Sequence, residues 1–491
     1  MTSELWRSTA RDLARRIAAG EVSAIDATEA FIARIEAVDG AINAVVWRRF
    51  DAARAEARAI DASRAAGKPL GPLAGVPITI KECLALEGSP ATFGATEHKN
   101  DIARADEPAV AALRNAGAVI LGKTNVSQLL LFMETDNPVY GRTNHPSNPE
   151  RSPGGSSGGQ AAIVAAGGAA LGLGTDIGGS SRNPAAACGV VGFKPTAGVL
   201  PDRGQGSVAP EQQAVASQLG IIARDADDAA LALAITSGRS VDLESVDVAK
   251  LSIGWFDDDG IFPSTTAARR AVAEAMRALE ARGARVVPWS IADPRRFFRL
   301  FYGALTADRG ASWRRFLGKG ARDRRVAELE LAATKPRWLI ELVLALTNRR
   351  ATRAVIDAFA SGKAADYFRV VREIEDLRAE TLAALGPIDA LVSPASALPA
   401  LRHGASQEVG TMGIYTTMYN VLGWPAGVVP VTRVLKSEES DRVASKDPRD
   451  RVARKTELGS AGLPIAVQVA ARPGNDHVAL AVMRAIRPFA P

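Results

Sequence analysis

A run of small residues between positions 154 and 189 limits what this chain can fold into. It begins with GGSSGG (154–159), continues as GGQAAIVAAGGAALGLGTD (158–176) and ends with GTDIGGSSRNPAAACG (174–189). Glycine lowers the stability of a helix or strand by about 0.5–1 kcal/mol relative to alanine. So dense a cluster therefore indicates backbone that approaches a ligand closely or adopts positive φ angles. The alanine-rich middle predicts a helix and a short strand that pack very closely against their neighbours.

Composition excludes several classes of protein. The 491 residues are 47% hydrophobic and 23% charged, which is ordinary for a globular protein. Cys83 and Cys188 are too few for a disulfide framework and favour a reducing compartment. The N-terminal segment carries charges throughout, unlike an export signal, and no apolar run reaches the ~20 residues that span a bilayer. We therefore predict a soluble, cytoplasmic protein.

The net charge of +6 does not by itself indicate nucleic-acid binding. Basic residues concentrate at 293–325 but mix with acidic residues almost everywhere else. The sequence has no zinc-finger spacing, no aromatic RNA-binding motif and no basic heptads. We expect a small-molecule ligand and no nucleic acid.

Strand-like and helix-like segments alternate along the chain, which favours an α/β protein with a single large domain. Residues 8–70 have a helical pattern, with Ser23 as a candidate N-cap. Buried strands are predicted at five later segments: GVPITIK (75–81), GAVILGKTN (117–125), PIDALVSPASALP (387–399), GWPAGVVPVT (423–432) and GLPIAVQVAA (462–471). We assign 1–70 to a helical segment packed on the core and 71–491 to the main domain. Residues 434–460 have almost no apolar anchors, so we expect an exposed, mobile insertion between two core strands.

Two motifs suggest other chemistry and are better explained structurally. GAVILGKT (117–124) matches the Walker A pattern, but an apolar strand occupies the place of the flexible phosphate loop. GGSSGG satisfies G-x-S-x-G at both Ser156 and Ser157, but a proline-broken loop precedes it where a nucleophile elbow requires a strand. Only His403 and His477 lie downstream of these serines. A Ser-His-Asp hydrolase therefore stays a minor alternative.

A buried lysine can replace histidine as the base that activates a serine. Burial disfavours the ammonium form and lowers its pKa, which leaves a neutral amine at ordinary pH. Lys81 ends the apolar segment GVPITIK and is the candidate; the alternative is a lysine whose ammonium group reaches solvent at a strand end. Residues 177–180 present successive backbone N–H groups with little side-chain obstruction. Such a turn can form an oxyanion hole, in which each donor is worth about 2.7–4 kcal/mol of barrier.

The three segments around Lys81, Ser156 and Ser180 resemble the amidase signature family in order and spacing, and GWPAGVVPVT and GLPIAVQ resemble its closing strands. The resemblance covers nearly the whole chain and implies a mixed central β-sheet surrounded by α-helices. It implies a Ser–cis-Ser–Lys triad in which Ser180 is the nucleophile, Ser156 the bridging serine with a cis peptide bond, and Lys81 the base. Ile177, Gly178, Gly179 and Ser180 would form the oxyanion hole. Ser180 would form an acyl-enzyme, and no metal or organic cofactor is needed.

Within this family the chain looks most similar to the fatty acid amide hydrolases. That resemblance implies a helical cap at 294–360, with 335–356 facing a membrane; Trp338 and Leu342 belong to a nearly all-apolar helix flanked by basic residues. The alternative is a buried or dimer-interface helix, so a homodimer and peripheral membrane contact both stay open. We expect substrate-binding contacts from six residues: Leu130, Leu131, Phe132, Met133, Ser157 and Thr175. Asp176 is expected to cap the signature turn and Arg182 to be a structural ion-pair partner.

We predict an amidase that acts on substrates with an apolar acyl or aryl group, fatty acid amides among them. Alternatives on the same scaffold are a carbamate, ester or aryl-acylamide hydrolase. A glutamine amidotransferase subunit would require glutamine recognition and an obligate partner. A catalytically silent binding protein is disfavoured because Lys81, Ser156 and Ser180 are all present.

Overall fold

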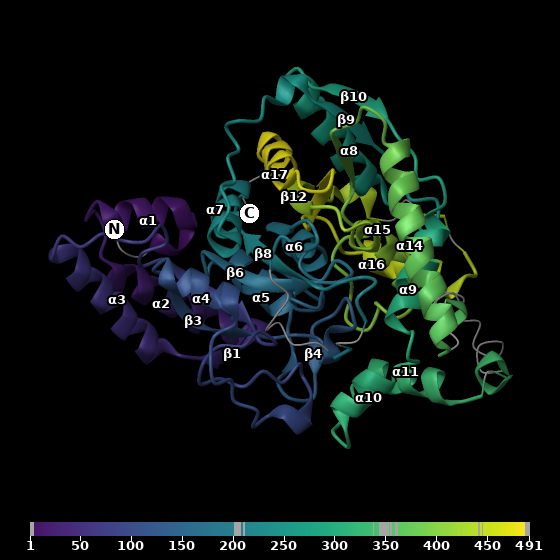
Figure 1. Cartoon of the computed structure of the whole chain (residues 1–491), viewed down its shortest axis with the longest axis horizontal. Helices are drawn as coiled ribbons and strands as arrows, with labels where there is room; N and C mark the ends of the chain where they lie inside the picture. The colour runs from purple at the N-terminus through teal and green to yellow at the C-terminus, as the bar shows by residue number, and fades with distance from the viewer. Residues whose placement is uncertain are drawn as a thin grey trace.

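An eleven-stranded sheet runs through the centre of the computed structural model and is wrapped by helices (Figure 1). The structure describes residues 4–200, 208–209, 212–336, 338–342, 353, 356–358, 362–439, 442–443 and 445–486. The strand order is β1-β3-β2-β6-β8-β7-β12-β13-β11-β9-β10, with parallel and antiparallel pairs. The predicted α/β fold with one mixed central sheet is confirmed.

The strands of this sheet are short and mostly buried. They are β1 (Val45–Arg48), β2 (Pro77–Lys81), β3 (Val119–Thr124), β6 (Leu171–Asp176), β7 (Val191–Lys194), β8 (Gln218–Ala223), β9 (Ser252–Trp255), β10 (Arg285–Pro288), β11 (Ala390–Pro394), β12 (Ala426–Arg433) and β13 (Pro464–Ala471). A separate two-stranded ribbon pairs β4 (Asp136–Asn137) with β5 (Gly141–Arg142). All five predicted buried strands lie in the central sheet.

The longer helices surround the sheet. They are α1 (Ala10–Ala18), α2 (Ala24–Ile42), α3 (Phe50–Ala65), α4 (Pro108–Asn115), α5 (Gly158–Ala165), α6 (Arg182–Cys188), α7 (Ala226–Ser237), α8 (Thr266–Glu280), α9 (Pro294–Leu305), α10 (Ala311–Leu317), α11 (Arg324–Thr334), α14 (Ala364–Ala384), α15 (Ile414–Leu422), α16 (Pro448–Glu457) and α17 (Asp476–Ala485). In Figure 1, α10 and α11 lie beyond α9 and α14, at the lower right of the molecule.

The N-terminal segment is not purely helical as predicted. Ser23 does cap α2, because its side chain accepts a hydrogen bond from the Asp26 N–H. Residues 45–48, however, form β1, which pairs antiparallel with β3 at the edge of the sheet. The helical pattern of 8–70 concealed this strand because it is only four residues long. One strand of the sheet therefore comes from the segment that the sequence pattern places outside the main domain.

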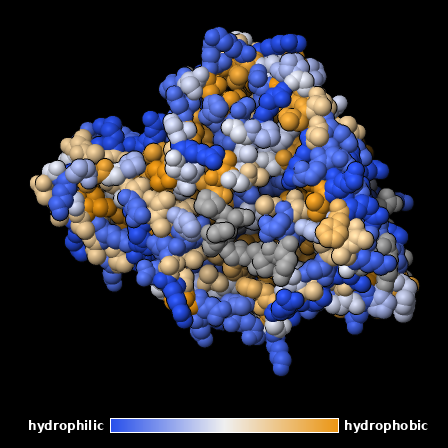
Figure 2. Space-filling view, viewed as in Figure 1, coloured by the Kyte–Doolittle hydropathy of each residue, from blue (hydrophilic) through white to orange (hydrophobic). Residues whose placement is uncertain are grey.

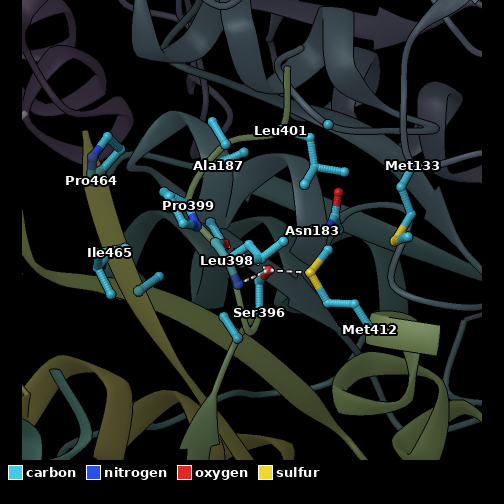
Figure 3. Close-up of a pocket in the computed structure, with 15 residues that line it drawn as sticks. Met133, Asn183, Ala187, Ser396, Leu398, Pro399, Leu401, Met412, Pro464 and Ile465 are labelled. Carbon is cyan, nitrogen blue, oxygen red and sulfur yellow. Dashed lines mark hydrogen bonds between the residues drawn. The ribbon is translucent and has the colours of Figure 1, made fainter. Parts of the chain in front are cut away.

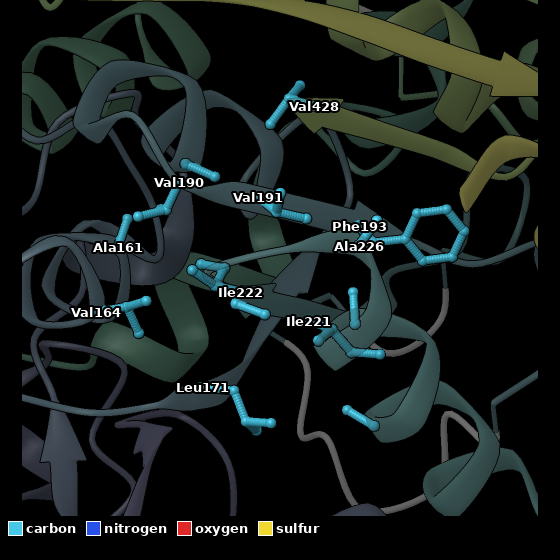
Figure 4. Packing of buried hydrophobic residues seen from close by; sticks show 14 of the residues in the cluster. Ala161, Val164, Leu171, Val190, Val191, Phe193, Ile221, Ile222, Ala226 and Val428 are labelled. Carbon is cyan, nitrogen blue, oxygen red and sulfur yellow. The ribbon is translucent and has the colours of Figure 1, made fainter. Parts of the chain in front are cut away.

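The small residues of 158–176 allow α5 to lie very close to the sheet. A Cβ atom at Gly172 of β6 would collide with the Gln160 side chain of α5, and one at Gly159 of α5 would lie 2.5 Å from the Asn125 nitrogen, just after β3. Around them, buried aliphatic side chains from α5, β6, β7 and β8 fill the core (Figure 4). The packing predicted from the alanine-rich run is present.

Two further sequence interpretations have different outcomes. The segment that matches the Walker A pattern is the buried strand β3, so the structural explanation is confirmed. Residues 434–460 were predicted to be an exposed segment. This prediction is wrong for much of the part of the segment that the structure describes, because that part contains the helix α16. Glu457 is 1% exposed there and pairs with Arg442 at 2.6 Å. Charged pairs such as this one hold the segment together with a few small apolar contacts, among them the fully buried Ala453, which explains why hydropathy did not reveal it.

The helices and the surface of the described part of the chain bear on the predicted membrane contact. No helix there is long and apolar enough to cross a bilayer. On the face in Figure 2, hydrophilic and hydrophobic side chains are interspersed. Of the predicted apolar helix at 335–356, only residues 335–336, 338–342, 353 and 356 are described; Val343, Leu344 and Leu346 lie outside them.

Candidate active site

Lys81 lies at the end of β2, where the sheet topology places it beside β6. The two strands are parallel, with Ile80 opposite Leu173, so Lys81 and Thr175 emerge at the same edge of the sheet. Lys81 is fully buried, and its Nζ lies 2.7 Å from Ser156 Oγ and 2.8 Å from Thr175 Oγ1. Burial lowers the pKa of Lys81 to about 8. The expected interior position is therefore the observed one, and the solvent-reaching alternative is excluded.

Ser156 lies in the loop that leads into α5. The Gly155–Ser156 peptide bond is cis, as the resemblance implied. The Ser156 carbonyl accepts from the Ser127 N–H at 3.4 Å, and the next residue, Ser157, donates its N–H to the Ser180 carbonyl at 3.0 Å. The second of these contacts joins the loop of Ser156 to the loop of Ser180. No hydrogen bond among the described contacts joins the two serine hydroxyls directly, and catalytic hydrogen bonds commonly shorten only when substrate binds.

The loop 177–180 is ordered by the carboxylate of Asp176. Its oxygens accept from the Gly179 N–H at 2.8 Å and the Ser181 N–H at 3.2 Å, so Asp176 caps the turn as expected. The Gly179 N–H is therefore already occupied. The N–H groups of Ile177, Gly178 and Ser180 have no acceptor within the described part of the chain. Three of the four predicted oxyanion donors are thus available.

Two glycines in this loop have no room for a side chain. A Cβ at Gly178 would lie 2.8 Å from Phe301 Cζ, and one at Gly179 would lie 2.3 Å from Thr416 Oγ1. Gly179 also has a φ of +108°, which residues with a Cβ rarely adopt. Close packing by α9 and α15, together with this backbone angle, accounts for the glycine cluster.

Arg182 forms the predicted ion pair, and its partner is Asp176. The pair lies in the interior of the protein. Both Arg182 and Asp176 have 0% side-chain exposure, and their charged groups are 2.9 Å apart. Burial opposes ionisation of Asp176, but the Arg182 guanidinium and its hydrogen bonds prevail and hold the pKa of this carboxyl well below its usual range.

A cavity of about 240 Å³ opens at Ser180. Its wall includes Gly155 and Gly178 as well as the four predicted acyl-pocket residues, Leu130, Leu131, Phe132 and Met133. The remaining large apolar residues of its wall are Ile177, Phe301, Tyr302, Leu305, Trp313, Leu329 and Ile356. Sequence reasoning did not identify these wall residues of α9–α11, or Thr417 on α15, because no motif marks them. No histidine lines the cavity within the described residues, which argues against the Ser-His-Asp alternative.

Ser157 and Thr175 do not line this cavity, although we expected both to contact substrate. Ser157 is fully buried, and Thr175 is only 4% exposed, with its hydroxyl directed at Lys81. They lie behind the cavity wall, and Thr175 contacts the candidate base Lys81.

A second cavity lies between residues 183–187 and the segment 395–401 (Figure 3). Its volume is about 20 Å³, which is enough for one water molecule. Ser396 Oγ donates to the Leu398 carbonyl at 2.8 Å and lies 3.3 Å from Met412 Sδ across it. Met133 lines both cavities, but this one is too small for an organic substrate. No three His, Cys, Asp or Glu side chains in the described ranges come together as a metal site.

Known proteins are similar to this chain in sequence and in fold. A family model described as Amidase matches residues 26–480. Fatty-acid amide hydrolase 1 of Sus scrofa is 33% identical over 439 residues, which cover 85% of this chain and 76% of that protein. One subunit of the glutamyl-tRNA(Gln) amidotransferase of Carboxydothermus hydrogenoformans is 32% identical over 447 residues, covering 87% and 91% of the two chains. A solved structure of fatty acid amide hydrolase is similar in fold, with a TM-score of 0.85 over 99% of this chain and 85% of its own, at 23% identity.

The fold and these matches define a class of enzyme that hydrolyses carbon–nitrogen amide bonds. The chain belongs to the amidase family. The resemblance inferred from the sequence is therefore confirmed, including its similarity to fatty acid amide hydrolases.

Proposed function

We propose that this amidase uses Lys81, Ser156 and Ser180 as a proton-relay triad. The observation that carries the proposal is the buried Lys81 Nζ, which lies 2.7 Å from Ser156 Oγ and has a pKa lowered to about 8. A neutral amine at this position can accept the Ser156 proton while Ser156 accepts the proton of Ser180.

The reaction then proceeds in two halves. Ser180 Oγ attacks the amide carbonyl, and the N–H groups of Ile177, Gly178 and Ser180 stabilise the oxyanion. Lys81 returns the proton through Ser156 to the leaving nitrogen, so the C–N bond breaks and the acyl group stays on Ser180. A water molecule, deprotonated along the same relay, attacks the acyl-enzyme and releases the acid.

The cavity favours a neutral substrate with an apolar acyl or aryl group. The described part of its wall contains two charged residues, and both are engaged by neighbours. Arg325 pairs with Asp323 at 2.8 Å and with Glu134 at 3.3 Å, while Glu328 contacts Arg324 at 3.0 Å and Gln407 at 3.1 Å. Both charges are therefore already paired, which disfavours their pairing with the amino and carboxylate groups of free glutamine. This supports an amidase over a glutamine amidotransferase subunit.

Hydrolysis of a matched series of acyl anilides is expected to accelerate with acyl length until the cavity of about 240 Å³ is filled. Each buried methylene adds about 0.8 kcal/mol of apolar transfer energy, or roughly fourfold in kcat/KM. The measurement is kcat/KM from acetyl to long acyl groups, with one aryl carbamate and with Ser180→Ala as the blank. A maximum at acetyl or on the carbamate would overturn the preference for long acyl groups and favour a general amidase or urethane hydrolase.

We also propose that the exposed apolar residues of the cap bind a lipid surface. Trp338 is 69% exposed and Leu342 is 50% exposed, both in the helical stretch 338–342. An exposed tryptophan and leucine near basic residues suit an interfacial helix. A second copy of this chain is the competing occupant of the same surface.

A variant carrying Trp338→Ala and Leu342→Ser is expected to bind anionic vesicles at least about fivefold less than the wild type, because both apolar contacts are lost. Co-sedimentation measures the bound fraction. Leu435→Ser removes an equally exposed leucine far along the chain and serves as the matched control. If neither the wild type nor the double variant binds vesicles, and only the double variant loses self-association in sedimentation equilibrium, the surface is a dimer interface instead.

A further inference from the structure

The glycines that make room in the loop 177–180 also deprive it of rigidity. Glycine explores more backbone conformations than any other residue, whereas oxyanion donors must be held about 2.7–3.1 Å from the developing charge. Side chains from elsewhere must therefore fix the loop. Building on the proposed function, we infer that Thr416, Asn420 and Gln468 are positioning residues for the oxyanion hole.

Thr416 holds one end of the peptide group between Gly178 and Gly179. Its hydroxyl lies 2.8 Å from the Gly178 carbonyl, to which it donates, and 3.1 Å from the Gly413 carbonyl. The other end of the same peptide, the Gly179 N–H, donates to Asp176 Oδ1 at 2.8 Å. With both ends held, the peptide plane cannot rotate. The adjoining Gly178 N–H, one of the available donors, is thereby kept in place.

Asn420 lies one helical turn after Thr416 on the same side of α15. Its amide nitrogen donates to Asp176 Oδ1 at 3.0 Å, and its amide oxygen accepts from Arg182 Nη2 at 2.6 Å. A single side chain thus bridges both members of the buried ion pair. It keeps the carboxylate directed at the loop and the guanidinium directed at the carboxylate.

Gln468 supplies the third restraint from β13. Its oxygen accepts from Arg182 Nη1 at 2.7 Å, and its nitrogen donates to the Tyr415 carbonyl at 2.6 Å. Arg182 Nη1 also donates to the Thr416 carbonyl at 3.0 Å. Gln468 therefore joins the ion pair to the first turn of α15. No more than 5% of any of these side chains is exposed, so water does not compete for the contacts.

The same network also balances the negative charge of Asp176. Asp176 orders the loop with a negative charge close to the position where the oxyanion develops, and an unbalanced carboxylate there would oppose that charge. Arg182 balances it, and the buried Lys194 lies close enough to lower the pKa of Asp176 further. Asn420 and Gln468 hold the Arg182 guanidinium in the orientation that maintains this balance.

Thr416→Val tests the inference because valine keeps the shape of threonine and removes only the hydroxyl. We expect kcat on an acyl anilide to fall roughly 10- to 100-fold, with KM within about twofold, since the ground-state cavity is unchanged and a transition-state contact is weakened. The rate of labelling by a fluorophosphonate should fall in parallel. Thr416→Ser restores the hydroxyl and is expected to recover kcat to within about threefold. Thr28→Val, at a fully buried helical threonine whose hydroxyl has no partner in the described structure, is the matched control.

Asn420→Asp provides an independent second variant. It is isosteric, removes the donation to Asp176 and places a second carboxylate beside it, so the expected loss is again in kcat and not in KM. Three outcomes would each overturn the positioning role. They are an unchanged kcat in Thr416→Val, equal losses of kcat in Thr416→Val and Thr416→Ser, and an effect of Thr416→Val that is confined to KM. A wild-type chain that neither hydrolyses the anilide nor reacts with the fluorophosphonate would overturn the proposed function as well, which separates the two failures.

Discussion

Replacing Ser180 by alanine is expected to lower kcat for any amide substrate by at least about 10⁴-fold, because the variant lacks the hydroxyl that is proposed to form the acyl-enzyme. The Ser180 hydroxyl makes no hydrogen bond within the described structure, so its removal should change the melting temperature by no more than about 2 °C. Steady-state hydrolysis of an acyl anilide and a thermal melt provide the two measurements.

Labelling with a fluorophosphonate distinguishes this result from simple misfolding. The wild type should carry one label per chain and the alanine variant none. Turnover in Ser180→Ala above one thousandth of the wild-type rate would contradict the assignment of the nucleophile.

Replacing Lys81 by methionine should also abolish most activity, with a loss in kcat of roughly 10²–10⁴-fold, the range for general-base catalysis. Methionine has a similar length and no charge, so it suits the fully buried position. The wild type should show a kcat/KM that rises with pH and levels off above about 8, because only the neutral amine accepts a proton and burial has lowered the pKa of Lys81 to about 8.

The pH profile and the variant test the same residue in different ways. The residual activity of Lys81→Met should lack the ascending limb near pH 8. If the ascending limb of the pH profile persists in this variant, it arises from another group, and the assignment of Lys81 as the base is contradicted. Thr175, whose hydroxyl lies 2.8 Å from Lys81 Nζ, should remain buried in both proteins.

The chemistry of this molecule was more predictable from its sequence than the shape of its binding site. Short apolar runs with glycine or proline boundaries identified β2, β3, β11, β12 and β13, five of the eleven strands, and the dense glycines identified the loop at Ser180. The edge strand β1 was missed because four residues within a helical pattern carry little periodicity. The burial of Glu457 was missed because hydropathy does not register ion pairs.

The cavity wall was only partly predictable for a different reason. Leu130 to Met133 lie in one continuous segment, whereas Phe301, Trp313, Leu329 and Thr417 come from four separate helices. Their proximity depends on how those helices pack, which no local pattern encodes. The unexpected placement of Thr175 behind Lys81 follows from the parallel register of β2 and β6.

The proposed triad and much of the cavity wall come from different parts of the chain. Lys81, Ser156 and Ser180 lie at the ends of β2 and β6 and in the loop before α5, while α9 to α11 contribute much of the apolar wall. Wall residues on α10 and α11 can therefore be exchanged with less effect on the proposed triad than Phe301 of α9, which packs against Gly178. The substrate range of such an enzyme can therefore diverge through changes in one helical segment while the residues of the proposed triad stay the same.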